Sequence, residues 1–174
     1  MNKYIKKVKT QEDKLYKKVL LLSRNKLFYT KFDLSDTFEN RINLIFLHIS
    51  FLFIRTKQKN EKLIYREFDQ KLFDYTFKKI ELNMREVGYS DMTINKKMKF
   101  LINKFYNILL DSEKYAQKNI KNKNLYLLKY LSQNNDKKST INIVLIEYFN
   151  AYQAFCFDLS SDSVLNGDLD FNYK

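Results

Sequence analysis

The chain has 174 residues, of which 45% are hydrophobic, and its formal net charge at pH 7 is +12. This length supplies one sizeable hydrophobic core and requires no second domain. Proline is absent and Gly88 and Gly167 are the two glycines, which argues against sandwiches and barrels because those folds need many tight turns. We therefore predict an all-α protein, folded as a single compact multi-helix domain over residues 1–174.

The positive charge suits an anionic partner such as RNA or an acidic membrane surface. Part of this charge has a simpler source. Lys greatly outnumbers Arg, Asn, Ile and Tyr are abundant, and Trp is absent, a composition that an AT-rich genome gives whatever the function. The charge alone therefore does not identify a partner.

The cysteine and histidine content restricts the chemistry. Cys156 and His48 are the single residues of their types, so no intramolecular disulfide forms and too few soft ligands exist for a structural zinc site. The start of the chain lacks the apolar stretch of a secretory signal and the Arg and Ser bias of an organelle transit peptide. We expect a bacterial protein of the reducing cytoplasm, with the inner face of the membrane as its alternative location.

The most apolar stretch runs from Ile42 to Ile54. It spans 13 residues between Arg41 and Arg55, whereas a bilayer-crossing helix needs about 20. We expect this stretch to be a buried core helix, and we expect no transmembrane span.

Helical spacing of apolar residues divides the chain into helices with recognisable ends. Thr10 with Asp13 and Asp36 with Glu39 are placed to cap the starts of two helices. Gly88 is placed to end a later helix in the left-handed conformation. The predicted helices are 11–28, 37–57, a third from about Asn60 to Gly88, a fourth that carries Ile94 to Ile108, 123–131 and 139–157.

The third and fourth of these helices each carry one apolar stripe, with steps of four and three residues, and we expect both stripes to pack on a common core. The stripes are Phe73, Phe77, Ile80, Met84 and Val87 in the third helix, and Ile94, Met98, Leu101, Phe105 and Ile108 in the fourth.

The composition changes at residue 158, after which Asp is frequent and Lys almost absent until the end. We predict a helical core over residues 11–157 and an acidic, mostly irregular tail over residues 158–174.

No catalytic constellation is visible in the sequence. Phosphate-binding loops need closely spaced glycines, and Gly88 is the one glycine in the first 166 residues. A Cys156–His48 dyad would require two residues typical of the core to meet by chance. We predict no catalytic, cofactor or metal site, and hence a protein that is not an enzyme.

Arg41, His48 and Arg55 are spaced by seven and therefore share one stripe of the apolar helix, which we expect to be partly buried. Asp74 and Glu81 are also seven apart and could face these cations from the third helix.

An alternative is equally open, because Asp74, Lys78, Glu81 and Arg85 could form a solvated ladder of pairs along their own helix. His48 itself is more typical of a hydrogen-bonded core residue than of a haem ligand, and we predict the core role.

Four lysines lie outside the apolar stripe of the fourth helix: Lys96, Lys97, Lys99 and Lys104. They are the candidate basic docking face. The alternative is a solvated helix surface made of the commonest residue of this chain.

Two long segments resemble the ubiquinol-cytochrome c chaperone family. Leu34 to Arg55 is similar to the opening motif of that family at Asp36, Thr37, Arg41, Leu47, His48 and Arg55. Leu72 to Lys99 is similar to its central signature at Phe73, Asp74, Phe77, Arg85, Glu86, Gly88, Asp91, Lys97 and Lys99.

The resemblance implies an assembly chaperone of the ubiquinol-cytochrome c reductase. Such a protein would bind newly made cytochrome b, act with a small helical partner and contact the ribosome near the tunnel exit, without binding DNA. The motif residues that carry over as partner-binding or structural polar groups are Asp36, Thr37, Arg41, His48, Arg55, Asp74, Arg85, Glu86, Asp91 and Lys97. The alternative function is a ribosome- or RNA-associated basic factor unrelated to cytochrome b.

Overall fold

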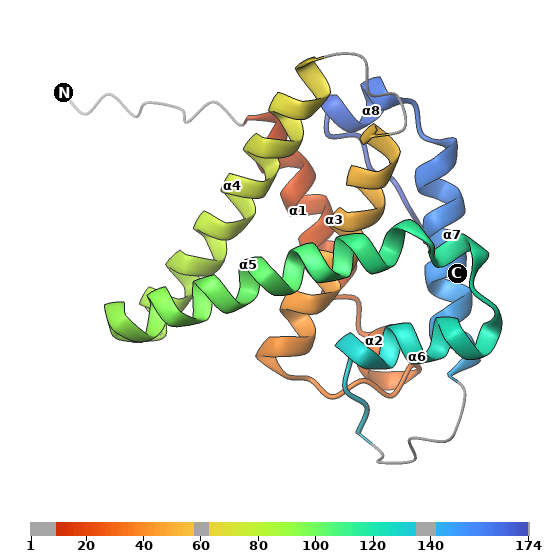
Figure 1. The fold of residues 1–174 in the computed structure, drawn as a ribbon, viewed down its shortest axis with the longest axis horizontal. Coiled ribbons are helices and arrows are strands. Elements are labelled where there is room, and N and C mark those ends of the chain that lie inside the picture. Colours follow the sequence, from red (N-terminus) through yellow and green to blue (C-terminus); the bar gives the residue numbers. More distant parts are fainter. Residues whose placement is uncertain (1–9, 58–62, 135–141, 174) are drawn as a thin grey trace.

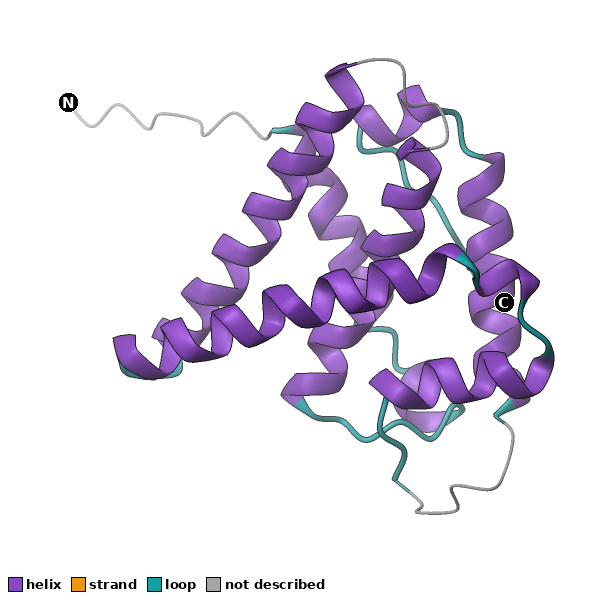
Figure 2. Cartoon of the chain, in the orientation of Figure 1, coloured by secondary structure: helices purple, strands orange, loops and turns teal. Residues whose placement is uncertain are grey.

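The computed structural model describes residues 10–57, 63–134 and 142–173, and helices make up most of them (Figure 2). The all-α prediction is confirmed. The elements are α1 (Gln11–Ser23), α2 (Leu27–Thr30), α3 (Phe38–Lys57), α4 (Leu63–Glu86), α5 (Asp91–Glu113), the 3-10 turn η1 (Tyr115–Gln117), α6 (Ile120–Tyr130), α7 (Ile143–Asp158) and α8 (Ser161–Leu165).

The first predicted helix is interrupted at Ser23. The Ser23 hydroxyl donates to the carbonyl oxygens of Val19 and Leu20 at 3.0 and 3.1 Å, and the Asn25 side chain accepts from the Leu27 amide at 3.0 Å, which starts α2. The predicted range 11–28 is therefore wrong after residue 23. The predicted starts at Asn60 and at residue 139 lie outside the described residues.

The first turns of α1 and α3 are capped by threonines. Thr10 Oγ1 accepts from the Asp13 amide at 3.3 Å, as the sequence predicts. At α3 the cap is Thr37, whose Oγ1 accepts from the Asn40 amide at 3.1 Å. The prediction of Asp36 as the cap is wrong, because the Asp36 carboxylate is bound to an arginine side chain.

Gly88 ends α4 in the left-handed region, with a φ of +92°, as predicted. The Tyr89 amide donates to the Met84 carbonyl at 3.1 Å and the Gly88 amide to the Arg85 carbonyl at 2.9 Å, which is the Schellman arrangement. The chain reverses here, so that α4 and α5 form a helical hairpin. Figure 1 shows its corner at the lower left, away from α6 and α7.

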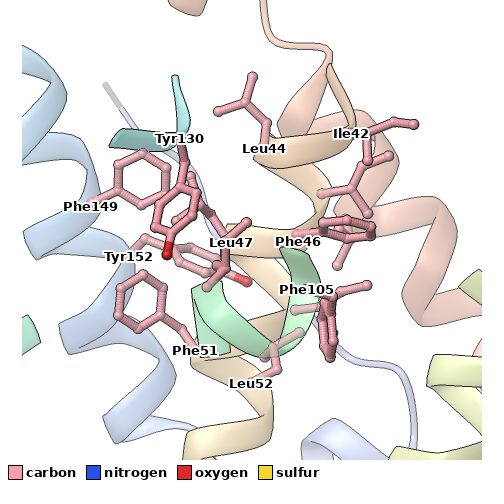
Figure 3. Packing of buried hydrophobic residues seen from close by; sticks show 14 of the residues in the cluster. Ile42, Leu44, Phe46, Leu47, Phe51, Leu52, Phe105, Tyr130, Phe149 and Tyr152 are labelled. Atoms are coloured by element: carbon pink, nitrogen blue, oxygen red, sulfur yellow. The ribbon is translucent and has the colours of Figure 1, made fainter. Parts of the chain in front are cut away.

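α3 lies at the centre of the fold, with α5 in front of it and α1, α4 and α7 around it (Figure 1). Its Phe46 and Leu47 have no exposed surface. On one side of α3 the Phe46 ring lies 5.3 Å from that of Phe105 on α5. On another side the Phe51 ring centre lies 6.3 Å from that of Phe149 on α7. Figure 3 shows α3 side chains pointing to both neighbours.

Among the described helices, none is long and apolar enough to cross a membrane. The prediction for Ile42 to Ile54 is borne out by the structure, which buries most of this stretch inside the helical core.

The predicted stripes of α4 and α5 pack on this core with one exception. Phe77, Ile80 and Met84 are buried, whereas Val87 is 72% exposed. The prediction of Val87 as a core residue is wrong because α4 ends at Glu86, and the turn at Gly88 carries Val87 off the buried face.

The acidic tail is irregular after α8, and it packs against α1. Lys14 Nζ lies 2.6 Å from Asp168 Oδ1, and Lys18 Nζ lies 2.5 Å from Asp170 Oδ1. Leu169, between these aspartates, is buried. The two ion pairs therefore hold the tail along α1, with the Leu169 side chain buried between them.

Replacement of Leu47 with Ala tests the central position of α3. A fully buried leucine loses its contacts and leaves a cavity, so we expect the free energy of unfolding to fall by about 2–5 kcal/mol in urea denaturation. Leu63→Ala is the matched control, because Leu63 is 74% exposed. Similar unfolding midpoints for the two variants would contradict the core position of Leu47.

Candidate partner-binding groove

His48 is a core residue with both ring nitrogens occupied. Nδ1 lies 2.6 Å from the Leu44 carbonyl oxygen and Nε2 lies 2.8 Å from the Tyr148 hydroxyl. These distances fit a neutral ring, with Nδ1–H donating to the carbonyl and Nε2 accepting from Tyr148. Burial lowers the pKa of His48 to about 4. The predicted core role is what the structure shows.

Arg55 is bound to a backbone carbonyl. Its Nε and one terminal nitrogen donate to the Leu159 carbonyl oxygen at 2.9 and 2.7 Å. Leu159 follows the last residue of α7, so the cation lies where the helix leaves unpaired carbonyls. Arg55 thus fastens the end of α7 to the last turn of α3.

Arg41 pairs with Asp36 through two hydrogen bonds of 2.7 and 2.9 Å, and both side chains are about half exposed. The Arg41 guanidinium holds the pKa of the Asp36 carboxyl below its usual value. The partner of Arg41 is therefore the nearby Asp36, which precedes α3.

The proposed pairing of α3 with Asp74 and Glu81 is wrong. Asp74 accepts from Gln70 at 2.8 Å, and Glu81 accepts from Arg85 at 2.8 and 3.0 Å, all within α4. Of the predicted ladder within α4 the structure shows the Glu81–Arg85 pair, whereas the hydrogen-bond partner of Asp74 is Gln70. Arg85 also donates to Asp91 at 2.5 Å and so joins the two arms of the α4–α5 hairpin.

The four lysines of the candidate docking face do not form one surface. Lys96, Lys97 and Lys99 are exposed, and the Lys97 ammonium lies 5.3 Å from the centre of the Tyr89 ring. Lys104 is instead mostly covered and bound to Glu39 at the start of α3. Lys104 therefore belongs to the packing of α5 on α3.

A groove of about 240 Å³ lies between α1, α3 and the end of α4. Its floor is apolar, and its rim carries Phe38 and Val87, which are 48% and 72% exposed. The residues that line it are Tyr16, Leu20, Ser23, Arg24, Phe38, Arg41, Ile42, Ile45, Ile80, Asn83, Glu86 and Val87.

This groove brings the two sequence motifs together. Arg41 from the first motif and Glu86 from the second both line it, and the Asp36 partner of Arg41 adds a third motif residue beside it. Sequence reasoning named these residues but did not place them at one site. The feature that sequence reasoning missed is the exposure of Val87, which the apolar periodicity alone assigns to the core.

A second cavity of about 280 Å³ lies between α3, α4 and α5, with Phe53, Phe73 and Tyr106 among its walls. The Asp69 carboxylate on its wall accepts from the Thr56 hydroxyl at 2.7 Å, and burial raises the pKa of Asp69 to about 7. Both motif segments reach its wall through Phe53 and Phe73, but of the residues that match the family only Phe73 lies there. The α1/α3/α4 groove holds a matched residue of each motif, Arg41 and Glu86, and we therefore take it as the candidate site.

The described residues hold no cluster of His, Cys, Asp and Glu side chains suited to a metal ion. Burial raises the pKa of the Cys156 thiol to about 12, so the thiolate is disfavoured. The His48 nitrogens are taken by Leu44 and Tyr148, and the Cys156–His48 dyad does not form.

A family model described as "Ubiquinol-cytochrome C chaperone" matches residues 30–171, which include both motifs and all the motif residues of the groove. The chain belongs to the ubiquinol-cytochrome c chaperone family. This membership makes it a chaperone in the assembly of the ubiquinol-cytochrome c reductase.

A crystal structure of the Cbp3 homolog from Brucella abortus has the same fold as this family member. The TM-score is 0.78 at 21% sequence identity, and the match covers 94% of this chain and 89% of that chain. No curated protein matches the chain.

The buried His48 gives the chaperone a defined pH dependence. Its pKa falls from 6.5 in the unfolded chain to about 4 in the fold, so the unfolded state binds more protons between these values. The stability that comes from keeping His48 neutral is fully present above pH 6.5 and is lost as the pH falls toward 4.

We expect the wild type to lose about 2 kcal/mol more than His48→Gln between pH 7.5 and 5 in urea denaturation. The difference between the two proteins isolates His48, because Asp69, whose raised pKa acts in the opposite direction, is common to both. Parallel pH profiles would show that His48 is not neutral in the fold.

The two arginines of α3 should differ in their effect on stability. Arg55→Met removes two hydrogen bonds from a partly buried cation to a helix end, and we expect a loss of about 2 kcal/mol. Arg41→Met removes an exposed pair and should leave the urea midpoint nearly unchanged. A larger loss for Arg41→Met than for Arg55→Met would contradict these roles.

Proposed function

We propose that this chaperone holds newly made cytochrome b during assembly of the reductase, with the α1/α3/α4 groove as the client-binding surface. The observation that carries the proposal is the meeting of Arg41 and Glu86, from two motifs far apart in sequence, on the rim of one apolar groove. Family membership supports the reductase as the complex, and the groove supports the place of contact.

The chemistry of the groove fits an apolar segment of a membrane protein. Ile42, Ile45 and Ile80 form its buried floor, and Phe38 and Val87 supply the exposed apolar surface that can cover a client. The charged rim of Arg24, Arg41 and Glu86 offers contacts to the polar ends of such a segment. Burial of the client surface is favourable because it removes apolar area from water.

Holding a client requires a surface and no chemical step, so we propose a protein without catalytic activity of its own. The buried thiol of Cys156 and the occupied nitrogens of His48 support this proposal. We further propose that it acts in the bacterial cytoplasm at the inner face of the membrane. Contacts with the ribosome near the tunnel exit and with a small helical partner protein belong to the same proposal.

The groove is tested by Val87→Asp, with Leu125→Asp as the matched control. Both side chains are more than half exposed, so neither change should lower the melting temperature, and Leu125 lies on α6, away from the groove. A carboxylate placed against an apolar client segment should reduce the crosslinking yield of cytochrome b in cells about tenfold.

Deletion of the gene should lower the amount of assembled reductase and the b-type haem spectrum at unchanged transcript levels. Complementation by Leu125→Asp should restore both, and complementation by Val87→Asp should not. Full restoration by Val87→Asp would rule out the groove as the client-binding surface. Normal reductase in the deletion strain would rule out cytochrome b as the client.

A further inference from the structure

The outward face of α5 is a continuous stripe of exposed side chains. Its members follow steps of four and three residues, so they lie in one line along the helix. The inward face, with Ile94, Leu101, Phe105 and Ile108, is buried on the core. The outward stripe consists of Met92, Lys96, Lys99, Asn103, Tyr106 and Leu110, all exposed.

The outward stripe combines two lysines and an asparagine in its middle with large exposed apolar side chains toward its ends. Met92 is 84% exposed, Leu110 is 61% exposed, and Tyr106 and the flanking Phe100 are each at least half exposed. A surface helix of a globular protein normally directs polar side chains outward. Large apolar groups on both faces of α5 indicate that something covers the outer face.

The acidic residues of α5 are paired, whereas two of its exposed lysines are not paired with any residue that the structure describes. Its three acidic residues are each paired with a cation of the protein: Asp91 with Arg85, Asp111 with Lys129 and Glu113 with Lys57. Lys96 and Lys99, in the middle of the outward stripe, make no ion pair within the described part of the chain. The stripe therefore presents positive charge with no carboxylate in it.

We propose that the outward face of α5 docks on an anionic lipid bilayer, with the helix lying parallel to the membrane surface. Met92, Phe100, Tyr106 and Leu110 would enter the boundary between headgroups and acyl chains, while Lys96 and Lys99 contact anionic headgroups. Figure 1 shows α5 across the broad face of the molecule that is turned toward the viewer. This site is separate from the groove and needs no client.

The stripe fits a bilayer better than it fits RNA. Met92 and Leu110 lie five helical turns apart on the same line, and a nucleic acid would leave these aliphatic groups in water. A bilayer satisfies both ends of the stripe at once, because its interface accepts apolar side chains along the whole length of the helix.

The test is flotation of the purified full chain with vesicles of phosphatidylcholine, alone or mixed with phosphatidylglycerol, at low and high salt. We expect binding to the anionic vesicles and its loss at high salt. Lys96→Gln/Lys99→Gln should weaken the partitioning at least about tenfold, since each lysine near an anionic surface contributes about fivefold. Met92→Ser/Leu110→Ser should also weaken binding to the anionic vesicles at low salt, although it leaves the charge unchanged.

The matched control is Lys26→Gln/Lys31→Gln, which removes the same charge from exposed positions at α2. Full binding by this control supports a docking face on α5. An equal loss by the control, absence of binding to anionic vesicles, or retention on ribosomal RNA in place of vesicles would overturn the proposal. The groove variant Val87→Asp should still bind vesicles, so a failure of the client proposal leaves this one standing, and the reverse also holds.

Discussion

The burial of α3 on nearly all its faces is the constraint on which the rest of the structure depends. A helix surrounded by protein must satisfy its polar side chains inside the fold, because an unpaired buried polar group is costly. Asn40 does so with the loop before α3 and the loop after α6: its side chain donates to the Ser35 and Ser132 carbonyls at 2.7 and 2.8 Å and accepts from the Ser132 amide at 2.9 Å. Asn43 donates to the Tyr130 carbonyl at 2.6 Å, while its own Oδ1 and the Ser50 hydroxyl are the two buried polar side-chain atoms of α3 without a hydrogen-bond partner in the described structure. The polar groups of α3 therefore fix the positions of its neighbours.

The same constraint explains which surfaces are left uncovered. α4 has 24 residues and α5 has 23, so each is longer than the 20-residue α3 that they cover. At about 1.5 Å per residue the hairpin extends beyond the core, and its corner has nothing to pack against. Val87 and Met92 are exposed for this reason. The groove forms where the end of α4 passes the first turns of α3 and the end of α1.

Local patterns predicted the helices well, because apolar periodicity and caps such as Thr10 and Gly88 act within a few residues. The environments of the three residues spaced by seven on α3 were not predictable in the same way. Arg41, His48 and Arg55 lie on one line of α3, yet the first is half exposed, the second fully buried and the third bound to the end of α7. Position along a helix matters as much as the face, since the first and last turns leave the core.

The partners of surface charges were equally hidden from sequence reasoning. Lys104 and Glu39 are far apart in the chain, and only the packing of α5 on α3 brings them together. The aspartates of the tail were visible as a composition change, whereas their pairing with Lys14 and Lys18 depends on the return of the tail to α1. The groove depends on three helices at once, so the motif residues could be named from sequence while their common site could not.

The two proposed binding surfaces occupy different sides of the central helix. The groove is lined by residues of α1, α3 and α4 and by the turn after α4, and no residue of α5 contributes to it. The docking stripe lies on the side of α5 that faces away from α3, since Ile94, Leu101 and Phe105 occupy the inner side. A molecule docked through α5 would therefore keep its groove open. In the two proposals together, the groove holds the newly made client while the α5 stripe fixes the chaperone beside the bilayer.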